Sequence, residues 1–277
     1  PKPDPEPTDF VIAENVKGLV NLSNIKDIIQ SDFSTASDND YVVLNPKVLH
    51  AADFGVPQSR ERVIFIGIKK SALNIKALFE LTRETINLDY DPYPIKTHGF
   101  TSKNGDLNPP VTLKHIFENL LEPCLSSDPS QMFYSRAKYM GSHCQGQNEI
   151  NLNGIGPTIR AEHHGNIEFR RLSREHNGKI YQELENDRLI ERRLTPRECA
   201  LIQTFPPDFD FVVSASNSRF IVSPSSAYKL IGNAVPPLLA YHIAKRIEKI
   251  WDLYFKPDQD GHFTKSRASN QRVQVVT

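Results

Sequence analysis

The chain has 277 residues, 39% of them apolar, and its 33 Lys and Arg residues are balanced by 33 Asp and Glu residues. This length and apolar content are enough for one large domain or two modest domains with a real core. The balanced charge gives no sign of a nucleic-acid partner, although a basic cleft can exist on a neutral protein. No apolar run approaches the roughly 20 residues that span a bilayer, which argues against a membrane protein.

The cysteines argue against a metal site. Cys124, Cys144 and Cys199 are widely spaced and odd in number, and no CxxC pair indicates zinc. A reducing cytoplasm is the simplest interpretation. Because the chain begins with Pro1 and not with methionine, we expect that residue 1 is not the natural start of the gene product.

The first part of the chain alternates between strand and helix patterns. We predict, in order, a buried strand that ends on Glu14, a helix, a second strand, a loop and a third buried strand, over residues 10–13, 22–29, 41–49, 53–62 and 63–68. This order predicts an α/β fold that corresponds to the second half of an open sheet.

Periodicity is weak over residues 84–193, apart from a helical pattern over 113–121, and we predict a separate, loop-rich small domain there. Thr195 can then cap a helix, with Pro196 at its first position and Glu198 closing a capping box. The last predicted helix is amphipathic and covers residues 237–251. The predicted domains are therefore 1–83, 84–193 and 194–256, followed by a polar tail over 257–277 that we expect to fray.

Glu14 is the first candidate for chemistry. A carboxyl group at the carboxyl end of a buried strand lies where open α/β sheets place their ligands. If burial raises its pKa, this group can act as a proton partner. The alternative is an ordinary charged residue at the start of a loop.

Arg60 and Arg62 are the second candidates, in the segment from Gln58 to Arg62. In an extended segment, positions i and i+2 point to one face, so two guanidinium groups can address an oxygen and a phosphate together. The preceding segment around Gly55 predicts a sharp turn. A solvated charged loop is the alternative.

Asn233 is the third candidate. Gly232 permits a tight turn before it, and its side-chain amide offers both a donor and an acceptor. Pro236 and Pro237 then open the last helix. The alternative is a plain helix entry with a glycine turn.

Taken together, these segments resemble the later motifs of the cytosine-C5 DNA methyltransferases, in the family's order. The resemblance covers residues 8 to 253 and rests on Glu14-Asn15-Val16, on Gln58 to Arg62, on residues 194–200 with Thr204-Phe205-Pro206, and on residues 228–237. It implies the second half of a Rossmann-like, S-adenosylmethionine-dependent methyltransferase sheet with an inserted target-recognition domain. In such enzymes a cysteine thiolate adds to C6 of a flipped cytosine, and C5 then takes the methyl group.

The resemblance also implies roles for individual residues. Glu14 would contact N3 and N4 of cytosine, Arg62 would contact O2, and Arg60 would help to hold the nucleotide and the catalytic loop. The cofactor pocket would be lined by Phe205, Asn233, Ala234 and Val235. The recognition domain carries a Thr-Ile pair at Thr158, and the candidates for reading the major groove follow it: Arg160, Glu162, His163 and His164. For these four, a solvated loop is the alternative.

The family's Pro-Cys nucleophile and Gly-rich cofactor loop precede the Glu-Asn-Val motif, and neither is found in this sequence. Cys124 follows a proline but lies downstream, so we do not expect it to be the nucleophile. We expect the carboxyl-terminal half of a bacterial restriction-modification type enzyme, inactive alone. Its expected partners are duplex DNA and an upstream half, which is either a second subunit or a missing segment. The missing strands would leave an exposed sheet edge and poor solubility.

Two alternatives stay open. A catalytically silent DNA-recognition or regulatory module could keep this fold, although it would not need Glu14, Arg60, Arg62 and Asn233 together. An RNA cytosine-C5 methyltransferase is the other alternative, and the long recognition region over residues 84–193 favours DNA.

Overall fold

The protein was analysed as a computed structural model, which describes residues 8–21, 24–99, 107–135, 149–161, 169–170, 192–215, 219–256 and 273–276. The chain forms two compact units. Unit 1 consists of residues 1–50, 61–95 and 242–277, and unit 2 consists of residues 51–60 and 96–241. These units are defined by contacts between residues, whereas the domains predicted from the sequence are defined by the expected function of each segment. The predicted domain boundaries therefore stay a prediction.

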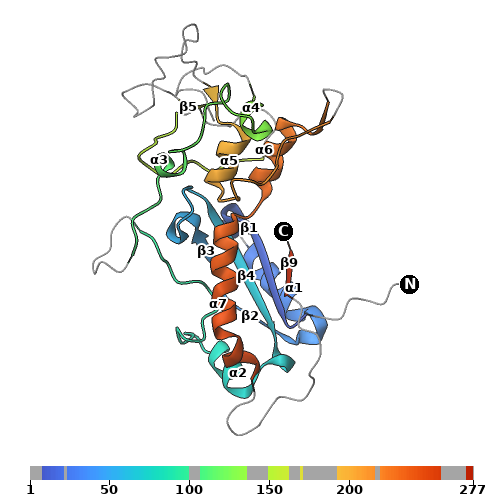
Figure 1. Cartoon of the computed structure of the whole chain (residues 1–277). Helices are drawn as coiled ribbons and strands as arrows, with labels where there is room; N and C mark the ends of the chain where they lie inside the picture. Colours follow the sequence, from blue (N-terminus) through green and yellow to red (C-terminus); the bar gives the residue numbers. More distant parts are fainter. Residues whose placement is uncertain are drawn as a thin grey trace. The chain divides into compact units, whose positions relative to one another are not determined.

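Unit 1 is built on a sheet in the order β2-β4-β1-β9, with β3 also paired to β4 (Figure 1). Its strands are β1 (Phe10–Val16), β2 (Tyr41–Val43), β3 (Lys47–His50), β4 (Glu61–Lys69) and β9 (Val273–Val276). Strand β4 is antiparallel to β1, β2 and β3, whereas β9 is parallel to β1. The α/β fold predicted from the sequence is confirmed.

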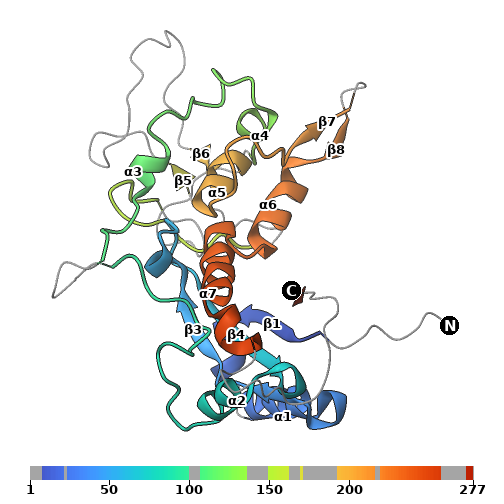
Figure 2. The ribbon, with the colours of Figure 1, turned by 60° about the horizontal axis from the view of Figure 1, so that its bottom comes forward.

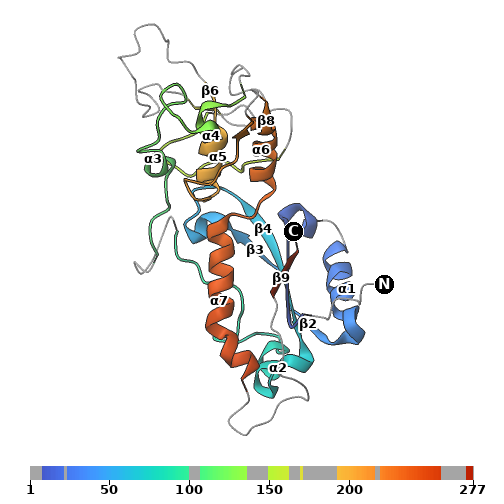
Figure 3. The same ribbon diagram turned by 45° about the vertical axis from the view of Figure 1, so that its right-hand side comes forward.

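Strand β4 is the centre of this sheet. Its residues from Val63 to Ile68 are buried on both faces, as expected for a strand that is covered by helices on both sides. Figure 3 shows α1 (Ile25–Asn39) on one face of the sheet and the part of α7 (Pro237–Phe255) that belongs to unit 1 on the other. The apolar run that predicts this strand is therefore explained by burial on two sides.

Helix α7 packs through one apolar stripe. Ile243, Ile247, Ile250 and Tyr254 are buried at a spacing of three or four residues, which places them on one side of a helix. The end of the helix is fixed by Asn74, whose side chain donates to Leu253 O at 2.9 Å and caps α2 (Ile75–Leu81). Short 3-10 turns at Lys17–Asn21 and Lys70–Ala72 complete unit 1.

Unit 2 consists of short elements around one core. They are a 3-10 turn at Ala51–Phe54, α3 (Leu113–Ile116), α4 (Pro129–Met132), β5 (Phe169–Arg170), β6 (Arg192–Arg193), α5 (Pro196–Ile202), β7 (Val213–Ser214), β8 (Phe220–Val222) and α6 (Pro224–Asn233). Leu113, Ile159, Ile202 and Ile231 come from distant parts of the chain and are buried in the same cluster. Figure 2 shows the β7–β8 hairpin beside α4 and α6.

Two boundaries change the position of candidate residues. Strand β1 continues to Val16, so Glu14 lies within the strand and not at its carboxyl end. Strand β4 begins at Glu61, so Arg62 lies in the strand and not in the preceding loop. The predicted sharp turn before it is confirmed, because Gly55 has φ +81° and a Cβ atom at this position would lie only 2.7 Å from the ring of His98.

Other predicted elements differ in length. The strand predicted over 41–49 is interrupted at Pro46, which has no N–H for the ladder. Helix α1 extends to Asn39, and residues 22 and 23 lie outside the described residues. The helix predicted over 113–121 is shorter than expected and ends at Ile116, and its cap residue Thr112 makes no side-chain hydrogen bond that would stabilise its first turn.

The tail is not frayed throughout, and this part of the prediction is wrong. Strand β9 lies in the segment predicted as a polar tail and pairs in parallel with residues 10–13 of β1. A backbone partner on this side of β1 satisfies hydrogen bonds that an open edge would expose. The edge predicted to be bare is therefore partly covered by the chain's own last strand.

The predicted capped helix at Thr195 is confirmed. Thr195 Oγ1 accepts from Glu198 N at 3.0 Å, and the Glu198 carboxylate accepts from Thr195 N at 2.8 Å. Thr195 Oγ1 also donates to Gln131 Oε1 at 2.5 Å. Arg192 lies 2.8 Å from Glu198 and 2.9 Å from Glu122, so the buried capping carboxylate has a cation beside it, which it shares with a second carboxylate.

Replacing Thr195 by alanine should lower the free energy of unfolding by about 1–3 kcal/mol, because it removes a helix cap and leaves a buried amide without its acceptor. Urea denaturation of the full chain measures the change. Thr195→Ser keeps the hydroxyl and is the matched control, expected to lose less than half as much. Equal stability of the alanine variant and the unmodified chain would show that the cap does not hold α5.

Candidate active site

Glu14 and Arg62 meet on neighbouring strands of unit 1. The register pairs Val16 with Arg62, so Glu14 is the diagonal neighbour of Arg62 on the same face of the sheet. Arg62 Nε lies 2.8 Å from Glu14 Oε1, and the two side chains are only 11% and 13% exposed. The structure therefore brings together the two residues that the resemblance assigns to the cytosine ring.

The charges of this pair depend on each other. Burial lowers the pKa of Arg62, and the adjacent Glu14 carboxylate opposes that shift. Arg62 Nη1 also donates to Glu61 O at 2.8 Å, which orients the guanidinium along the strand. A largely buried carboxylate beside a guanidinium offers hydrogen-bond acceptors and donors that can bind the edge of one planar polar ring.

Arg60 lies in a different environment from the one predicted. It belongs to unit 2, its residue is 1% exposed, and Nη1 donates to Ile159 O at 2.9 Å. Nη2 donates to Gly232 O at 2.9 Å and to Ala234 O at 3.0 Å. Residue 60 lies before the first residue of β4, so the side chains of residues 60 and 62 need not point to the same face, as they would within one strand. The guanidinium of Arg60 thus binds main-chain carbonyls, and the expected role of Arg60 with Arg62 in holding a nucleotide stays a prediction.

Two buried glutamines, to which the sequence analysis gave no role, extend this network. Gln58 Nε2 donates to Gln203 Oε1 at 2.6 Å, and Gln203 Nε2 donates to Ile231 O and Ala234 O, both at 2.7 Å. Both residues are fully buried. Gln58 lies in one of the motifs on which the family resemblance rests. Nothing in the sequence indicates a role for Gln203 except that it directly precedes the motif residue Thr204.

The turn before Phe205 is tied to the start of α7. Thr204 has φ +66°, a strained conformation for a β-branched residue. Its hydroxyl accepts from Leu238 N at 3.1 Å. The ring of Phe205 packs edge-on against Phe211 with 4.8 Å between centroids. The turn that carries Phe205 and the loop of Asn233, Ala234 and Val235 thus share one hydrogen-bonded framework in unit 2.

The recognition candidates are only partly described. The hydroxyl of Thr158 donates to Ser59 O, so this side chain connects two segments of unit 2. Arg160 is exposed. Glu162, His163 and His164 lie outside the described residues, and their proposed role in base reading stays a prediction.

Cys199 is buried, as expected for a small core residue, whereas Cys124 is exposed and Cys144 lies outside the described residues. Over the described part of the chain, no group of three or more His, Cys, Asp or Glu side chains is arranged to hold a metal ion. Within the same residues, no helix has the length and apolar character required to cross a membrane.

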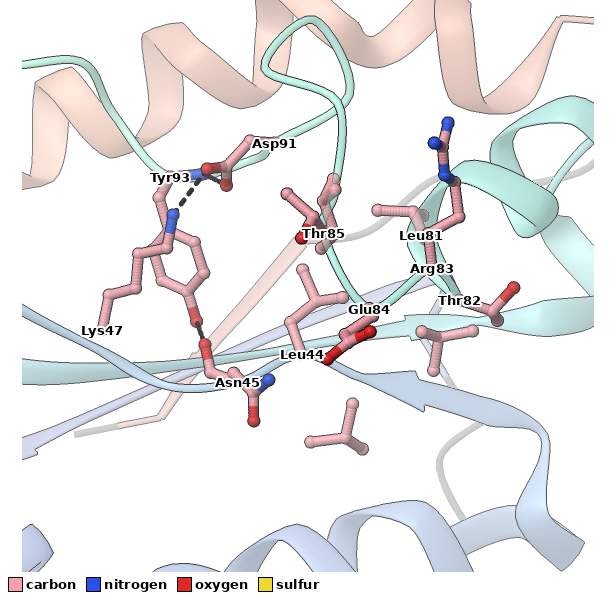
Figure 4. A pocket seen from close by; sticks show the side chains of 13 residues that line it. Leu44, Asn45, Lys47, Leu81, Thr82, Arg83, Glu84, Thr85, Asp91 and Tyr93 are labelled. Carbon is pink, nitrogen blue, oxygen red and sulfur yellow. Dashed lines mark hydrogen bonds and ion pairs between the residues drawn. The ribbon is translucent and has the colours of Figure 1, made fainter.

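A separate hollow of about 530 Å³ lies in unit 1 beside β2 and β3 (Figure 4). Two of its charged groups form an ion pair, since Lys47 lies 2.5 Å from Asp91, and Lys47 also lies 4.7 Å from the centre of the Tyr93 ring. The Tyr93 hydroxyl donates towards the carbonyls of Asn45 and Ile64, and burial, aided by Asp91, raises its pKa. These contacts tie residues 91 and 93 to the strand segment around Asn45 and Lys47.

A family model for C-5 cytosine-specific DNA methylases matches residues 5–249. The chain belongs to this family. It is 32% identical over 260 residues to the type II methyltransferase M.FnuDI of Fusobacterium nucleatum, covering 87% of this chain and 64% of that protein. It is 28% identical to M.BsuRI of Bacillus subtilis, covering 94% of this chain and 53% of that protein. The resemblance stated from the motifs is confirmed.

Solved structures agree in fold. The DNMT2 structure from Spodoptera frugiperda superposes with a TM-score of 0.53 at 18% identity, over 88% of this chain and 66% of that one. The Dnmt2 methyltransferase of S. pombe gives a TM-score of 0.50 at 16% identity, with the same coverage of both chains. The chain thus has the fold of cytosine-C5 methyltransferases but spans only about half to two thirds of the length of these relatives.

A double-mutant cycle of Glu14→Gln and Arg62→Gln should give a coupling energy of about 1–3 kcal/mol in urea unfolding, because each charge is largely removed from water. The matched control is the pair of Lys17 and Glu61, which is similar in length at 2.9 Å but 46% and 44% exposed. Its coupling should be below about 0.5 kcal/mol. Equal coupling in both cycles would show that the Glu14 pair is an ordinary surface ion pair.

Proposed function

We propose that this chain supplies the base-holding and DNA-recognising part of a DNA cytosine-C5 methyltransferase, and that an upstream half supplies the nucleophile and the cofactor loop. The observation that carries the proposal is the largely buried pair of Glu14 and Arg62 in strands β1 and β4. The type II methyltransferases among its relatives support a role in modifying a specific duplex site, as part of a restriction-modification system.

The pair suits the polar edge of cytosine. N3 and O2 of the base are acceptors, and the exocyclic amine is a donor. Arg62 would donate to O2, and Glu14 would hold a proton against N3 while accepting from the amine. Arg62 is ion-paired with Glu14 in the free protein, so moving the guanidinium to O2 of the base would leave the Glu14 carboxylate available to take up that proton.

This arrangement would stabilise the base during attack. When a thiolate adds to C6, negative charge develops over N3 and O2. A proton at N3 and a guanidinium at O2 oppose that charge in a place with little water, where electrostatic stabilisation is strongest. The chain would thus lower the barrier to covalent addition by means of Glu14 and Arg62, while the attacking sulfur comes from the other half.

The residues predicted for S-adenosylmethionine fit one wall of its site. Asn233 is exposed and offers an amide donor and acceptor, while Phe205 keeps part of its ring accessible. The carbonyls of Gly232 and Ala234 accept hydrogen bonds from Arg60, so the cofactor would be held by the side chains of this loop and not by these carbonyls. S-adenosylmethionine supplies the methyl group, and the side chains of this loop would hold the cofactor in place.

The proposal is tested by transfer of a labelled methyl group from S-adenosylmethionine to mixed duplex DNA. We expect no transfer by the chain alone and transfer after addition of the upstream half, which is the polypeptide that carries the Pro-Cys and Gly-rich motifs. Transfer RNA serves as the parallel substrate. Transfer to RNA and not to DNA would contradict the proposal.

In the assembled enzyme, Glu14→Gln should lower methyl transfer by about 100-fold or more, because the amide cannot carry the shared proton. Binding to duplex DNA, measured by fluorescence anisotropy, should stay within about twofold, since the substitution alters contacts to the base only. Glu61→Gln, which changes an exposed carboxylate in the same pair of strands, is the control. Full activity of Glu14→Gln would remove Glu14 from the mechanism.

A further inference from the structure

We propose that Arg60 is a positioning residue that holds the recognition segment 158–160 and the loop 232–234 in one arrangement. Its loss should therefore disturb DNA binding and cofactor binding together. The functions of the two segments rest on the proposed function, whereas their joint positioning rests on the contacts of Arg60 alone.

The contacts of Arg60 join two distant parts of the chain. One amino group of its guanidinium donates to Ile159 O, and the other donates to Gly232 O and Ala234 O, at 2.9 to 3.0 Å. A planar guanidinium can serve carbonyls on several sides at fixed angles, whereas an ammonium group is a single point on a flexible stem. The side chain therefore fixes the relative placement of both segments.

The main chains of these segments touch directly. A Cβ atom on Gly232 would lie 2.4 Å from the carbonyl carbon of Arg160 and from the amide nitrogen of Ala161, so only glycine permits this approach. On its other side, the segment is held by Thr158, which donates to Ser59 O, and by Ser59 N, which donates to Gly156 O at 2.7 Å. The recognition segment is thus enclosed between residues 58–60 and Gly232.

Each enclosed segment carries an outward side chain. Arg160 follows Ile159 and is exposed, and Asn233 follows Gly232 and is also exposed. Because a binding side chain is only as well placed as the main chain that supports it, the buried ties behind both residues set their positions. One guanidinium therefore supports the DNA-facing candidate and the cofactor-facing candidate at once.

The first test is hydrogen exchange on the full chain, followed by mass spectrometry. In Arg60→Lys, peptides that cover 156–161 and 231–240 should both exchange at least about tenfold faster, because their shared anchor is lost. The control is Arg197→Lys. Arg197 is also buried, and it donates to Asp128 at 2.5 Å and to Phe209 O at 2.9 Å. It should leave both peptides unchanged. Faster exchange in one peptide only would overturn the proposal.

Gly232→Ala provides a second route if Arg60→Lys does not fold. It leaves the guanidinium intact but forces the two main chains apart, so both peptides should again exchange faster. Thr158→Val removes only the bond to Ser59 and should affect 156–161 alone. A change confined to 231–240 in Gly232→Ala would show that the two segments are positioned independently.

Ligand binding by the assembled enzyme separates this proposal from the proposed function. Arg60→Lys should raise the Kd for duplex DNA and the Kd for S-adenosylmethionine, each by about tenfold, while Arg160→Ala affects DNA and Asn233→Ala affects the cofactor. If the two single-site variants change neither Kd, the proposed function fails. If they behave as expected but Arg60→Lys changes only one Kd, the positioning role fails.

Discussion

The burial of the Arg60 guanidinium is the constraint on which the arrangement of unit 2 depends. A charged group that is withdrawn from water must be surrounded by acceptors, and here the acceptors are main-chain carbonyls of residues 159, 232 and 234. Gln203 binds the same loop at residues 231 and 234. Two segments of unit 2 that are far apart in the sequence are thus held together by one side chain.

The stretch from Gln58 to Arg62 serves both compact units. Its first part, with Gln58 and Arg60, is buried in unit 2, and its last two residues lie in β4 of unit 1, where Arg62 pairs with Glu14. Five consecutive residues therefore connect the proposed base contact, the recognition segment and the proposed cofactor loop. A charge-neutral protein can still bind a charged ligand, because only the charge close to the ligand has to match it.

Local patterns explain which features could be predicted from the sequence. The apolar run of β4 and the capping box at Thr195 depend on neighbouring residues, and both are found as predicted. The network of Arg60 depends on partners about 100 residues or more away, so the spacing of charges suggested solvent and phosphate instead. Local patterns indicate Glu14 and Arg62 as separate candidates, but only the family resemblance implies that they act on one base, because no local pattern shows which strands are neighbours.

The proposed division of labour between this chain and an upstream half is tested most directly with a DNA duplex that contains 5-fluorocytosine at the target position. Fluorine cannot leave C5 as a proton does, so the bond between the attacking thiolate and C6 persists. We expect a denaturation-resistant adduct on the upstream half, formed only when this chain is present and lost in Glu14→Gln. An adduct on this chain alone, through one of its own cysteines, would contradict the proposed division.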